Sequence, residues 1–332
     1  MLKLMIQALD IQHLVTPRDE NQLRQYTDAA AAFRHHQTAL KEAREVRGSM
    51  VWRTVKGREY LVRTSTTGSQ SSLGPRSEET TRMYERFMAR KEAAKQVLKA
   101  RQAQLETMRK LNRAYQVGRT PNLVVDVLSA LQDAGISEQF MTIGTHAMYA
   151  YESACGVMVD ASALATRDMD LLYDTRRHIA FMTTMNRMDS AFIDVLRKAD
   201  RTFKVLDDQK QTAVNEQGFE VDVVRRTAIG DDPHPLAMSD KEGDLWAVQV
   251  STGNRLVSSK PFNQLVVASS GRMAMMQTVD PGTFVDVKTR LAAMPSRDAL
   301  KRPKDLLQAR VVAYLIDEYM PDFARANPPT PA

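Results

Sequence analysis

The segment TRDMDLLYD (residues 166–174) places two aspartates, Asp168 and Asp170, at the start of an apolar run. The run predicts a β-strand, in which residues two apart point to the same face. Both carboxylates therefore lie on one face, with Met169 and Leu171 on the other. Neighbouring carboxylates oppose each other's ionisation, a cost that a divalent cation between them removes. The segment predicts either a metal site or an acidic patch at an exposed strand edge.

A later segment, FEVDVV (residues 219–224), places Asp222 in the middle of another apolar strand. A lone carboxylate there is costly unless it is paired or bound to a metal. One interpretation is a structural salt bridge between Asp222 and Arg225, Arg226 or another basic residue. If instead the two acidic strands lie side by side, three carboxylates converge, and oxygen ligands of this kind suit magnesium.

The strand-to-helix junction IGTHA (residues 143–147) precedes the acidic pair. Gly144 lets the backbone approach a ligand closely. Free N–H groups at the start of the following helix, which is predicted to begin at Thr145, can hold phosphate oxygens. His146 lies in an apolar helix and is interpreted as a packing residue rather than a catalyst.

The bulk composition narrows the class of protein. The chain has 332 residues with 43% hydrophobic content, enough for one large domain or two ordinary ones. Its net charge of +6 is compatible with an anionic partner such as RNA, DNA or a nucleoside triphosphate. The single cysteine, Cys155, excludes a disulfide framework and a cysteine zinc site, and we interpret it as an inert core residue. The start MLKLMIQALDIQ lacks the pattern of a signal peptide, and no run of about 18 apolar residues exists, so we expect a cytoplasmic protein without a membrane span.

The pattern along the chain predicts four parts. Residues 1–120 form a mostly helical N-terminal region with a β-hairpin and a long basic helix. Residues 121–278 form an α/β core, in which helices and strands alternate. Residues 279–325 form a helical C-terminal region, where Pro303 suits the first turn of a helix. Residues 326–332 are predicted to be a disordered tail.

Particular elements are predicted within these parts. The N-terminal region is expected to contain a helix from Glu20 to Arg47, a hairpin over 51–62, a polar loop over 64–75 and a helix from Ser77 to about Val117. The core is expected to contain a helix ending at Gly135, a strand over 139–144, helices over 178–198, and strand pairs within 211–224 and 264–276. Two C-terminal helices are expected over 283–294 and 296–320.

The second N-terminal helix is basic. From Ser77 to Arg119 there are eleven Lys or Arg and five Glu, a net charge of +6. The helix is either a solvated face or a phosphate-tracking surface for nucleic acid. The hairpin would extend such a surface with Trp52, Arg53, Lys56, Arg58 and Tyr60.

The ordered set of a glycine turn, an Asp-x-Asp strand and a third strand acid resembles the nucleotidyltransferases of the DNA polymerase β superfamily. The chain more closely resembles a bacterial family of minimal nucleotidyltransferases. The segments that carry this resemblance are IGTHAMYAYE, TRDMDLL, FEVDVV, MVWRTVKGREYLVR, SLGPRSEETTRMYERF and KRPKDLLQA. The turn departs from the usual Gly-Gly or Gly-Ser, since this chain has Gly144 followed by Thr145. The resemblance covers most of the chain. It implies an α+β fold with a polymerase β-like mixed sheet, flanking helices and helical N- and C-terminal regions.

A second likeness concerns the C-terminal part. VDVKTRL followed by RPKDLLQA is similar to nucleotidyltransferase toxins of toxin–antitoxin systems. This likeness implies that Lys288 contacts the triphosphate and that an antitoxin protein is a partner. It also implies that Lys304 and Asp305 lie near the nucleotide or anchor a helix. The alternative is that both lysines are plain surface residues.

Together these likenesses imply Mg²⁺-dependent transfer of a nucleoside monophosphate from an NTP to an acceptor hydroxyl, with release of pyrophosphate. Asp168, Asp170 and Asp222 would hold two Mg²⁺ ions, and Gly144 and Thr145 would cradle the β- and γ-phosphates. The basic helix favours RNA as the acceptor, with a tRNA end and a toxin role as refinements. The alternatives are the same chemistry on a protein or small-molecule hydroxyl, and a non-catalytic nucleic-acid-binding protein.

Overall fold

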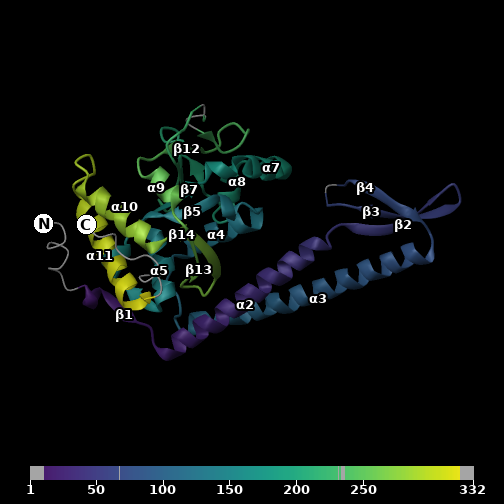
Figure 1. The fold of residues 1–332 in the computed structure, drawn as a ribbon, viewed down its shortest axis with the longest axis horizontal. Coiled ribbons are helices and arrows are strands. Elements are labelled where there is room, and N and C mark those ends of the chain that lie inside the picture. The colour runs from purple at the N-terminus through teal and green to yellow at the C-terminus, as the bar shows by residue number, and fades with distance from the viewer. Residues whose placement is uncertain (1–10, 67, 231, 233–235, 322–332) are drawn as a thin grey trace. The chain divides into compact units, whose positions relative to one another are not determined.

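A computed structural model describes residues 11–66, 68–230, 232 and 236–321 of the chain (Figure 1). Contacts between residues divide it into two units. Unit 1 takes in residues 1–23 and 116–332, and unit 2 takes in residues 24–115. The predicted disordered tail, residues 326–332, lies outside the described residues. Within the described ranges, no helix is both long and apolar enough to cross a membrane.

A mixed β-sheet forms the centre of unit 1. Its main strands lie in the order β11 (Leu236–Ala237), β12 (Trp246–Gln249), β10 (Glu220–Arg225), β7 (Asp168–Tyr173), β5 (Phe140–Ile143), β14 (Met273–Val279) and β13 (Pro261–Val267). Two short strands join it beside β10, namely β9 (Thr212–Val214) and β8 (Lys204–Val205). β10 is parallel to β7 and β12, β14 is parallel to β5, and the other described pairs of this sheet are antiparallel. This mixture of directions agrees with the predicted α+β class.

The register between β7 and β10 determines where the acids meet. Asp222 lies opposite Asp170, and Glu220 lies opposite Asp168. Residues paired across neighbouring strands point to the same face, so these side chains share one face of the sheet. The alternate residues on the other face are fully buried: Met169, Leu171, Val221 and Val223.

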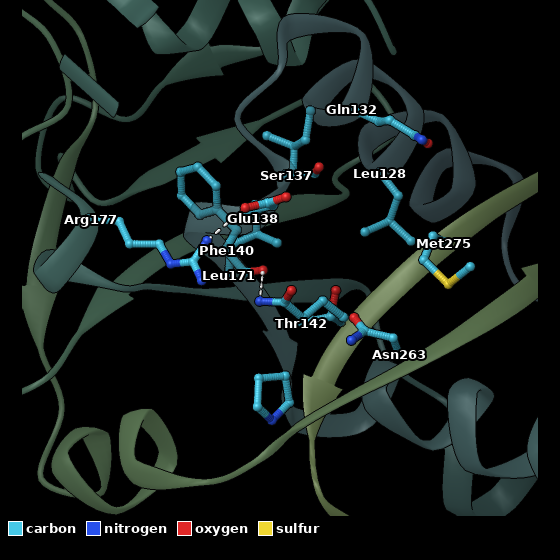
Figure 2. Close-up of a pocket in the computed structure, with 13 residues that line it drawn as sticks. Leu128, Gln132, Ser137, Glu138, Phe140, Thr142, Leu171, Arg177, Asn263 and Met275 are labelled. Carbon is cyan, nitrogen blue, oxygen red and sulfur yellow. Dashed lines mark hydrogen bonds and ion pairs between the residues drawn. The ribbon is translucent and has the colours of Figure 1, made fainter. Parts of the chain in front are cut away.

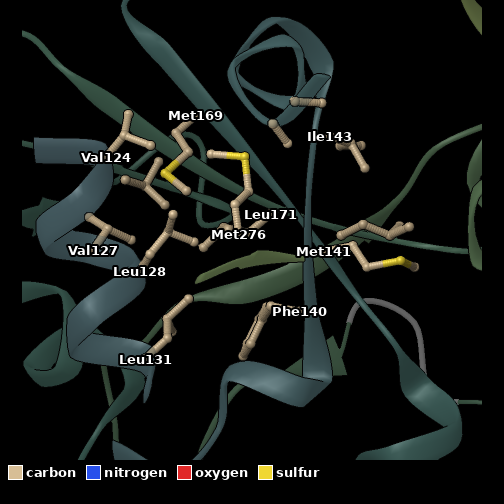
Figure 3. Close-up of a cluster of buried hydrophobic side chains, with 14 of the residues drawn as sticks. Val124, Val127, Leu128, Leu131, Phe140, Met141, Ile143, Met169, Leu171 and Met276 are labelled. Atoms are coloured by element: carbon tan, nitrogen blue, oxygen red, sulfur yellow. The ribbon is translucent and has the colours of Figure 1, made fainter. Parts of the chain in front are cut away.

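Helix α4 (Asn122–Ala134) covers the face of the sheet opposite the aspartates. Figure 3 shows its apolar side chains against those of the strands, and the buried residues include Val124, Val127, Leu128, Leu131, Phe140, Leu171 and Met276. The helix ends at Gly135, whose φ of +74° is the left-handed conformation that glycine adopts readily. The predicted helix end is therefore confirmed.

The C-terminal helices α10 (Pro281–Ala293) and α11 (Arg302–Tyr319) pack against each other. Asp280 caps α10 by accepting a hydrogen bond from the backbone N–H of Thr283 (2.9 Å). Pro303 lies in the first turn of α11, as predicted. The prediction of helix from residue 296 is wrong, because proline lacks the N–H that a helix interior needs, and α11 begins at Arg302.

The remaining helices and strands of unit 1 are short. In chain order they are β1 (Val15–Pro17), α5 (Met148–Cys155), β6 (Val157–Val159), α6 (Ala161–Leu164), α7 (His178–Met188), α8 (Phe192–Arg197) and α9 (Gly253–Ser258). The 3₁₀ helices are η1 (Gln12–Leu14), η2 (Ser137–Gln139), η3 (Gly144–Ala147) and η4 (Thr175–Arg177). η3 begins one residue before the predicted helix start at Thr145 and leads directly into α5.

Unit 2 consists of two long helices and a small antiparallel sheet. The helices are α2 (Glu20–Glu45), whose first turn belongs to unit 1, and α3 (Glu78–Ala114). The strands lie in the order β2 (Ser49–Val55), β3 (Arg58–Thr64) and β4 (Gln70–Pro75), so the predicted hairpin is confirmed. Its small core is formed by Val46, Met50, Leu61 and Phe87. Between the helices, Nε2 of Gln25 donates a hydrogen bond to Oδ1 of Asn112 (3.0 Å).

The structure corrects two predictions for the N-terminal region. The polar segment 64–75 is not wholly a loop, because Gln70–Pro75 pairs with β3 as strand β4. Ser and Gly have low strand propensity, and pairing with the edge of β3 overrides it. The basic helix is shorter than the predicted range 77–119 and ends at Ala114. Arg119 lies in unit 1, where its guanidinium pairs with Glu152 (2.6 Å).

The two units carry opposite charge. Unit 2 holds 20 Lys and Arg against nine Asp and Glu, a net charge of +11, whereas unit 1 holds 26 against 31, a net charge of −5. The exposed basic residues of α3 are Arg82, Arg86, Arg90, Lys95, Lys99, Arg109, Lys110 and Arg113. The basic excess of the whole chain therefore belongs to unit 2.

Candidate active site

The three predicted aspartates line one cavity of about 370 Å³, which we call the aspartate cavity. Asp168 and Asp170 reach it from β7, and Asp222 reaches it from β10. β7 lies between β5 and β10, so the acids are not a patch at a sheet edge. Arg225 and Arg226, the alternative partners for Asp222, pair with Asp232 instead (3.3 and 2.7 Å).

Gly144 makes room for the central carboxylate. Its φ is +66°, and a Cβ added there would collide with Oδ2 of Asp170. Any side chain at this position would displace the carboxylate and would also be strained by the left-handed backbone. Gly144 lines the cavity as well, so its backbone is close to any ligand held there.

The clustering of the carboxylates opposes their ionisation. Burial, followed by the charges of Asp168 and Asp222, raises the pKa of Asp170 to about 7. Burial also raises the pKa of Asp222, and the charge of Asp168 acts in the same direction. The positive charges of Lys288 and Lys301 partly oppose the rise in the pKa of Asp170. A cation between the carboxylates would remove the repulsion behind these shifts.

Two threonine hydroxyls position the outer aspartates. Thr212 donates a hydrogen bond to Oδ1 of Asp222 (2.5 Å), and Thr166 donates one to Oδ1 of Asp168. Burial acts to raise the pKa of Asp168, but the hydrogen bond from Thr166 and nearby charges outweigh burial, and the pKa lies below its usual value. Asp168 is therefore ionised at neutral pH, while Asp170 is divided between its two forms.

Three cationic side chains line the same cavity as the aspartates. They are Lys288 of α10 together with Arg297 and Lys301 of the segment that connects α10 to α11. Asp305 is buried behind them and accepts hydrogen bonds from Nζ of Lys288 (2.7 Å) and Nε of Arg297 (2.8 Å). Of the two roles predicted for Asp305, the geometry favours anchoring, because its carboxylate holds two of the three cations in place.

Thr145 and Lys304, which were also predicted to bind nucleotide, lie elsewhere. Thr145 is buried, and its hydroxyl accepts a hydrogen bond from Nε2 of Gln308 (3.0 Å). Nζ of Lys304 donates to the backbone oxygen of Ala165 (2.5 Å). Neither is among the described residues that line the aspartate cavity. Both contacts join α11 to segments that flank the acidic strand.

His146 and Cys155 have the packing roles that their surroundings predict. The His146 ring centroid lies 6.0 Å from that of Tyr149 and 5.9 Å from that of Phe219. Burial lowers the pKa of His146 to about 4, so the imidazole is neutral at physiological pH. Burial raises the pKa of the Cys155 thiol to about 12, which makes the thiol unreactive.

Apolar side chains complete the wall of the aspartate cavity. They are Val224, Val250, Leu256, Val279, Phe284, Val287 and Leu291. A cavity that combines an apolar wall with a few convergent polar groups is typical of ligand sites. Here the apolar wall suits a flat apolar part of a ligand, and the charged side chains suit an anionic group that binds together with a metal.

The donor set fits a divalent metal that is bound together with a phosphate ligand. Among the described residues, no group of three or more His, Cys, Asp or Glu side chains is already arranged to hold a metal ion. Magnesium is rarely held by an all-protein cage and usually takes one or two carboxylates with waters and substrate phosphates. The oxygen-only donors of Asp168, Asp170 and Asp222 match that mode of binding.

Sequence reasoning missed Arg297, Lys301 and Thr212. The first two lie in a segment that was assigned to a helix, and a surface charge there carried no sign of a cavity. Thr212 had a partial signal, because the predicted hairpin places it on the strand beside that of Asp222, and the structure pairs the two residues. A hydroxyl paired with a strand acid across a hairpin is close enough to hold the acid in place.

A mixed sheet that brings carboxylates together in a cavity with cations and an apolar wall can bind a metal with a phosphate ligand, as enzymes of phosphoryl transfer do. Comparison with family models makes the class definite, because residues 122–327 match a model described as nucleotidyltransferase. The match covers more than half of the chain, and the chain belongs to this nucleotidyltransferase family. Comparison with curated proteins and comparison with solved structures each found no match.

Proposed function

We propose that this nucleotidyltransferase moves a nucleoside monophosphate from an NTP to a hydroxyl of RNA, in a Mg²⁺-dependent reaction that releases pyrophosphate. The observation that carries the proposal is the aspartate cavity, which three carboxylates and three cationic side chains line together. We also propose that the mixed sheet has the polymerase β-like arrangement that the resemblance implies.

The aspartates supply the metal ligands for this reaction. The acceptor oxygen forms a bond to the α-phosphorus, and the bond from that phosphorus to the bridging oxygen of the β-phosphate breaks. Asp168, Asp170 and Asp222 would hold the metal. Bound magnesium would lower the pKa of the attacking hydroxyl and neutralise charge on the leaving pyrophosphate. Asp222 would accept the proton that the hydroxyl loses.

The cations are assigned to the triphosphate. Lys288, Arg297 and Lys301 lie in the same cavity as the acids, and Asp305 holds two of them in fixed positions. Charged donors that are held in place stabilise phosphate oxygens without reorganisation during the reaction. We keep the backbone of Gly144 as a phosphate contact. Thr145 and Lys304 are left out of the triphosphate site because neither is among the described residues that line the aspartate cavity.

The charge of unit 2 supports RNA as the acceptor. A net charge of +11 within 92 residues attracts a polyanion, whereas a small-molecule acceptor gains nothing from it. A tRNA end is one RNA that meets this description. The described residues offer no support for an antitoxin partner or a toxin role, and neither is part of the proposal.

The transfer is tested by incubating the purified protein with Mg²⁺, each α-³²P-labelled NTP in turn, and total RNA together with cell protein. Label in RNA that disappears in the Asp168→Ala/Asp170→Ala variant is the expected result. Label in a protein band would replace RNA by a protein hydroxyl as the acceptor. Absence of label with every NTP, in a protein that also fails to bind NTP and Mg²⁺, would contradict the proposal.

The role of unit 2 in holding RNA is tested with charge reversals matched between the units. Lys95→Glu/Lys99→Glu changes two exposed positions on α3, and Arg187→Glu/Lys198→Glu changes two exposed positions on unit 1. The first pair should weaken RNA binding and lower its salt dependence, while the second should leave both unchanged. Equal effects of the two pairs would show that unit 2 has no special role.

A further inference from the structure

A second cavity of about 430 Å³ lies across the same sheet from the aspartates (Figure 2). Thr142 and Leu171 line it, whereas the neighbouring residues Ile143 and Asp170 line the aspartate cavity. Consecutive residues of a strand point to opposite faces. The two cavities are therefore back to back, separated by β5 and β7.

The second cavity exists because the sheet opens at this point. Within the described residues, β5 and β14 pair at one position, Thr142 with Thr278. Ahead of that pair, the side chain of Gln277 reaches across and donates a hydrogen bond from Nε2 to the carbonyl oxygen of Phe140 (3.4 Å). A side chain thus takes the place of the missing ladder bonds, and space remains beside it.

One polar group at the wall of this cavity is unsatisfied. The Thr142 side chain belongs to a residue that is 1% exposed, and its hydroxyl has no hydrogen-bond partner among the described residues. A buried hydroxyl without a partner is costly, and such groups in native proteins call for a cause. Figure 2 shows Thr142 beside Asn263 at the cavity wall. The hydroxyl oxygen is not exposed to the cavity in this structure, and a ligand toward which the Thr142 side chain turns would supply the missing partner.

The other lining groups restrict the ligand to an uncharged one. Glu138 and Arg177 are the charged residues among the described lining residues, and they pair with each other (2.8 Å). The described lining therefore leaves no cation over for a phosphate. The remaining polar lining consists of amides and hydroxyls: Gln132, Ser137, Thr142, Asn263 and Gln277. We call this space the amide cavity.

Amide side chains select a particular kind of partner. An amide offers a donor and an acceptor side by side, and Asn or Gln matches the N6 and N7 edge of adenine in this way. The apolar lining comes from Leu128, Leu131, Phe140, Leu171, Pro261 and Met275 and suits the faces of a heterocycle. A volume of about 430 Å³ lies in the range of small-molecule sites.

We propose that the amide cavity binds an uncharged adenine nucleoside at a site separate from the aspartate cavity. The base would meet the amides of Asn263 and Gln277 and the hydroxyl of Thr142. Since Leu171 at this site is joined to Asp170 in β7, an occupant is positioned to influence the aspartates. Only that last consequence rests on the proposed function.

The test is isothermal titration of the full-length protein with adenosine, without NTP, metal or RNA. We expect saturable binding with a Kd below about 1 mM. Thr142→Val should weaken it roughly tenfold. Met275→Trp, at a rim residue that is 37% exposed, should block it by filling the cavity. Ser251→Ala is the matched control, because it removes one hydroxyl from the aspartate cavity and should leave adenosine binding unchanged.

Each result with these variants either supports or overturns adenosine binding in the amide cavity. Thr142→Val replaces an unpaired buried hydroxyl by a methyl group of the same shape, so its Tm should equal or exceed that of the unchanged protein. Absence of adenosine binding up to about 1 mM overturns the proposal. Binding that survives Thr142→Val and Met275→Trp but is lost in Ser251→Ala belongs to the aspartate cavity and overturns it too. Cytidine, measured in parallel, should bind more weakly.

Discussion

Unit 1 and unit 2 differ both in net charge and in architecture. Unit 1 is acidic and has a large sheet with buried carboxylates, while unit 2 is basic and has a core of a few side chains. A site that uses carboxylates to hold a metal is weakened when free cations neutralise those carboxylates. Two of the three cations that line the aspartate cavity, Lys288 and Arg297, are paired with Asp305. Under the proposed function, placing the surplus positive charge in another unit would let one chain bind both a metal cation and a polyanion.

The largest expected effect separates chemistry in unit 1 from binding in unit 2. Asp170→Asn should lower the rate of nucleotidyl transfer by about 10³-fold or more, because it removes a metal ligand worth several kcal/mol. RNA binding should be unchanged, and stability should not fall, because a repulsive charge is removed. Transfer rate, RNA affinity and Tm measured on one preparation test this. Loss of RNA binding in this variant would contradict the division between the units.

The next effect concerns the stability of unit 1. Asp305→Asn leaves Lys288 buried without its carboxylate, and breaking a buried pair in this way costs about 3–5 kcal/mol of unfolding free energy. Denaturant unfolding measures the change. An exposed pair in unit 2 is the control, because Glu78→Gln, which breaks its bond to Arg82, should cost about 0.5 kcal/mol.

The same carboxylate predicts a pH dependence. Burial would raise the pKa of Asp305, but hydrogen bonds and charges from Arg297 and Lys288 hold it below its usual value. The stability from this group is therefore fully present above the unfolded pKa of about 3.9 and is lost as the pH falls through the lower folded value. The difference in unfolding free energy between the unchanged protein and Asp305→Asn should be constant above about pH 5 and shrink only below about pH 4. A difference that shrinks already near about pH 6 would contradict the cause.

A smaller effect tests the glycine beside Asp170. Gly144→Ala should lower transfer about 10²-fold, because a Cβ there displaces the Asp170 carboxylate. Gly57→Ala in unit 2 is the matched control, since Gly57 has a φ of +77° and an added Cβ there meets nothing within 4 Å. Both variants should lose about 1 kcal/mol of stability from backbone strain. Equal transfer rates in the two variants would show that the collision at Asp170 does not matter.

The smallest expected effect is on the salt dependence of RNA binding by unit 2. Each phosphate that the basic helix no longer binds should reduce the slope of log affinity against log salt by about 0.7 to 0.9. Lys95→Glu/Lys99→Glu should therefore reduce the slope by up to about two of these steps. Filter binding of RNA at several salt concentrations gives the slope. A slope that is unchanged would remove this face of α3 from the RNA surface.

Local patterns predicted much of the fold. The period of two in TRDMDLLYD and FEVDVV indicated two strands, and Gly135 and Pro303 marked a helix end and a helix start. The strand β4 was not predicted, because its Ser and Gly residues carry no strand signal of their own and form a strand only by pairing with β3. Neither was the end of α3 at Ala114, because Tyr115, Gln116 and Val117 carry no helix-ending signal of their own.

Of the residues that line the aspartate cavity, the sequence predicted the three acids, Gly144 and Lys288. Asp168, Asp170 and Asp222 each interrupt an apolar strand, which is a signal visible in the sequence. Arg297 and Lys301 have no such signal, because a basic residue in a polar segment looks the same whether it faces solvent or a cavity. Thr145 shows the opposite error. A threonine after a glycine suggested a phosphate contact, but Gln308, far away in the chain, occupies its hydroxyl.

The buried Glu152 has a consequence for how such a protein can change. Its carboxylate binds Arg119, just after unit 2, and Arg18, just before it (3.4 Å), and Nε2 of Gln22 donates to the backbone oxygen of Gln116 (3.3 Å). The chain thus leaves unit 1 and returns to it at points that are within hydrogen-bond reach of each other. Unit 2 is an insertion whose two ends lie close together in unit 1. At such positions a domain can be gained or exchanged without distorting the fold that receives it. If unit 2 holds the acceptor, as we propose, changing this one insertion would change the acceptor and leave the chemistry of unit 1 the same.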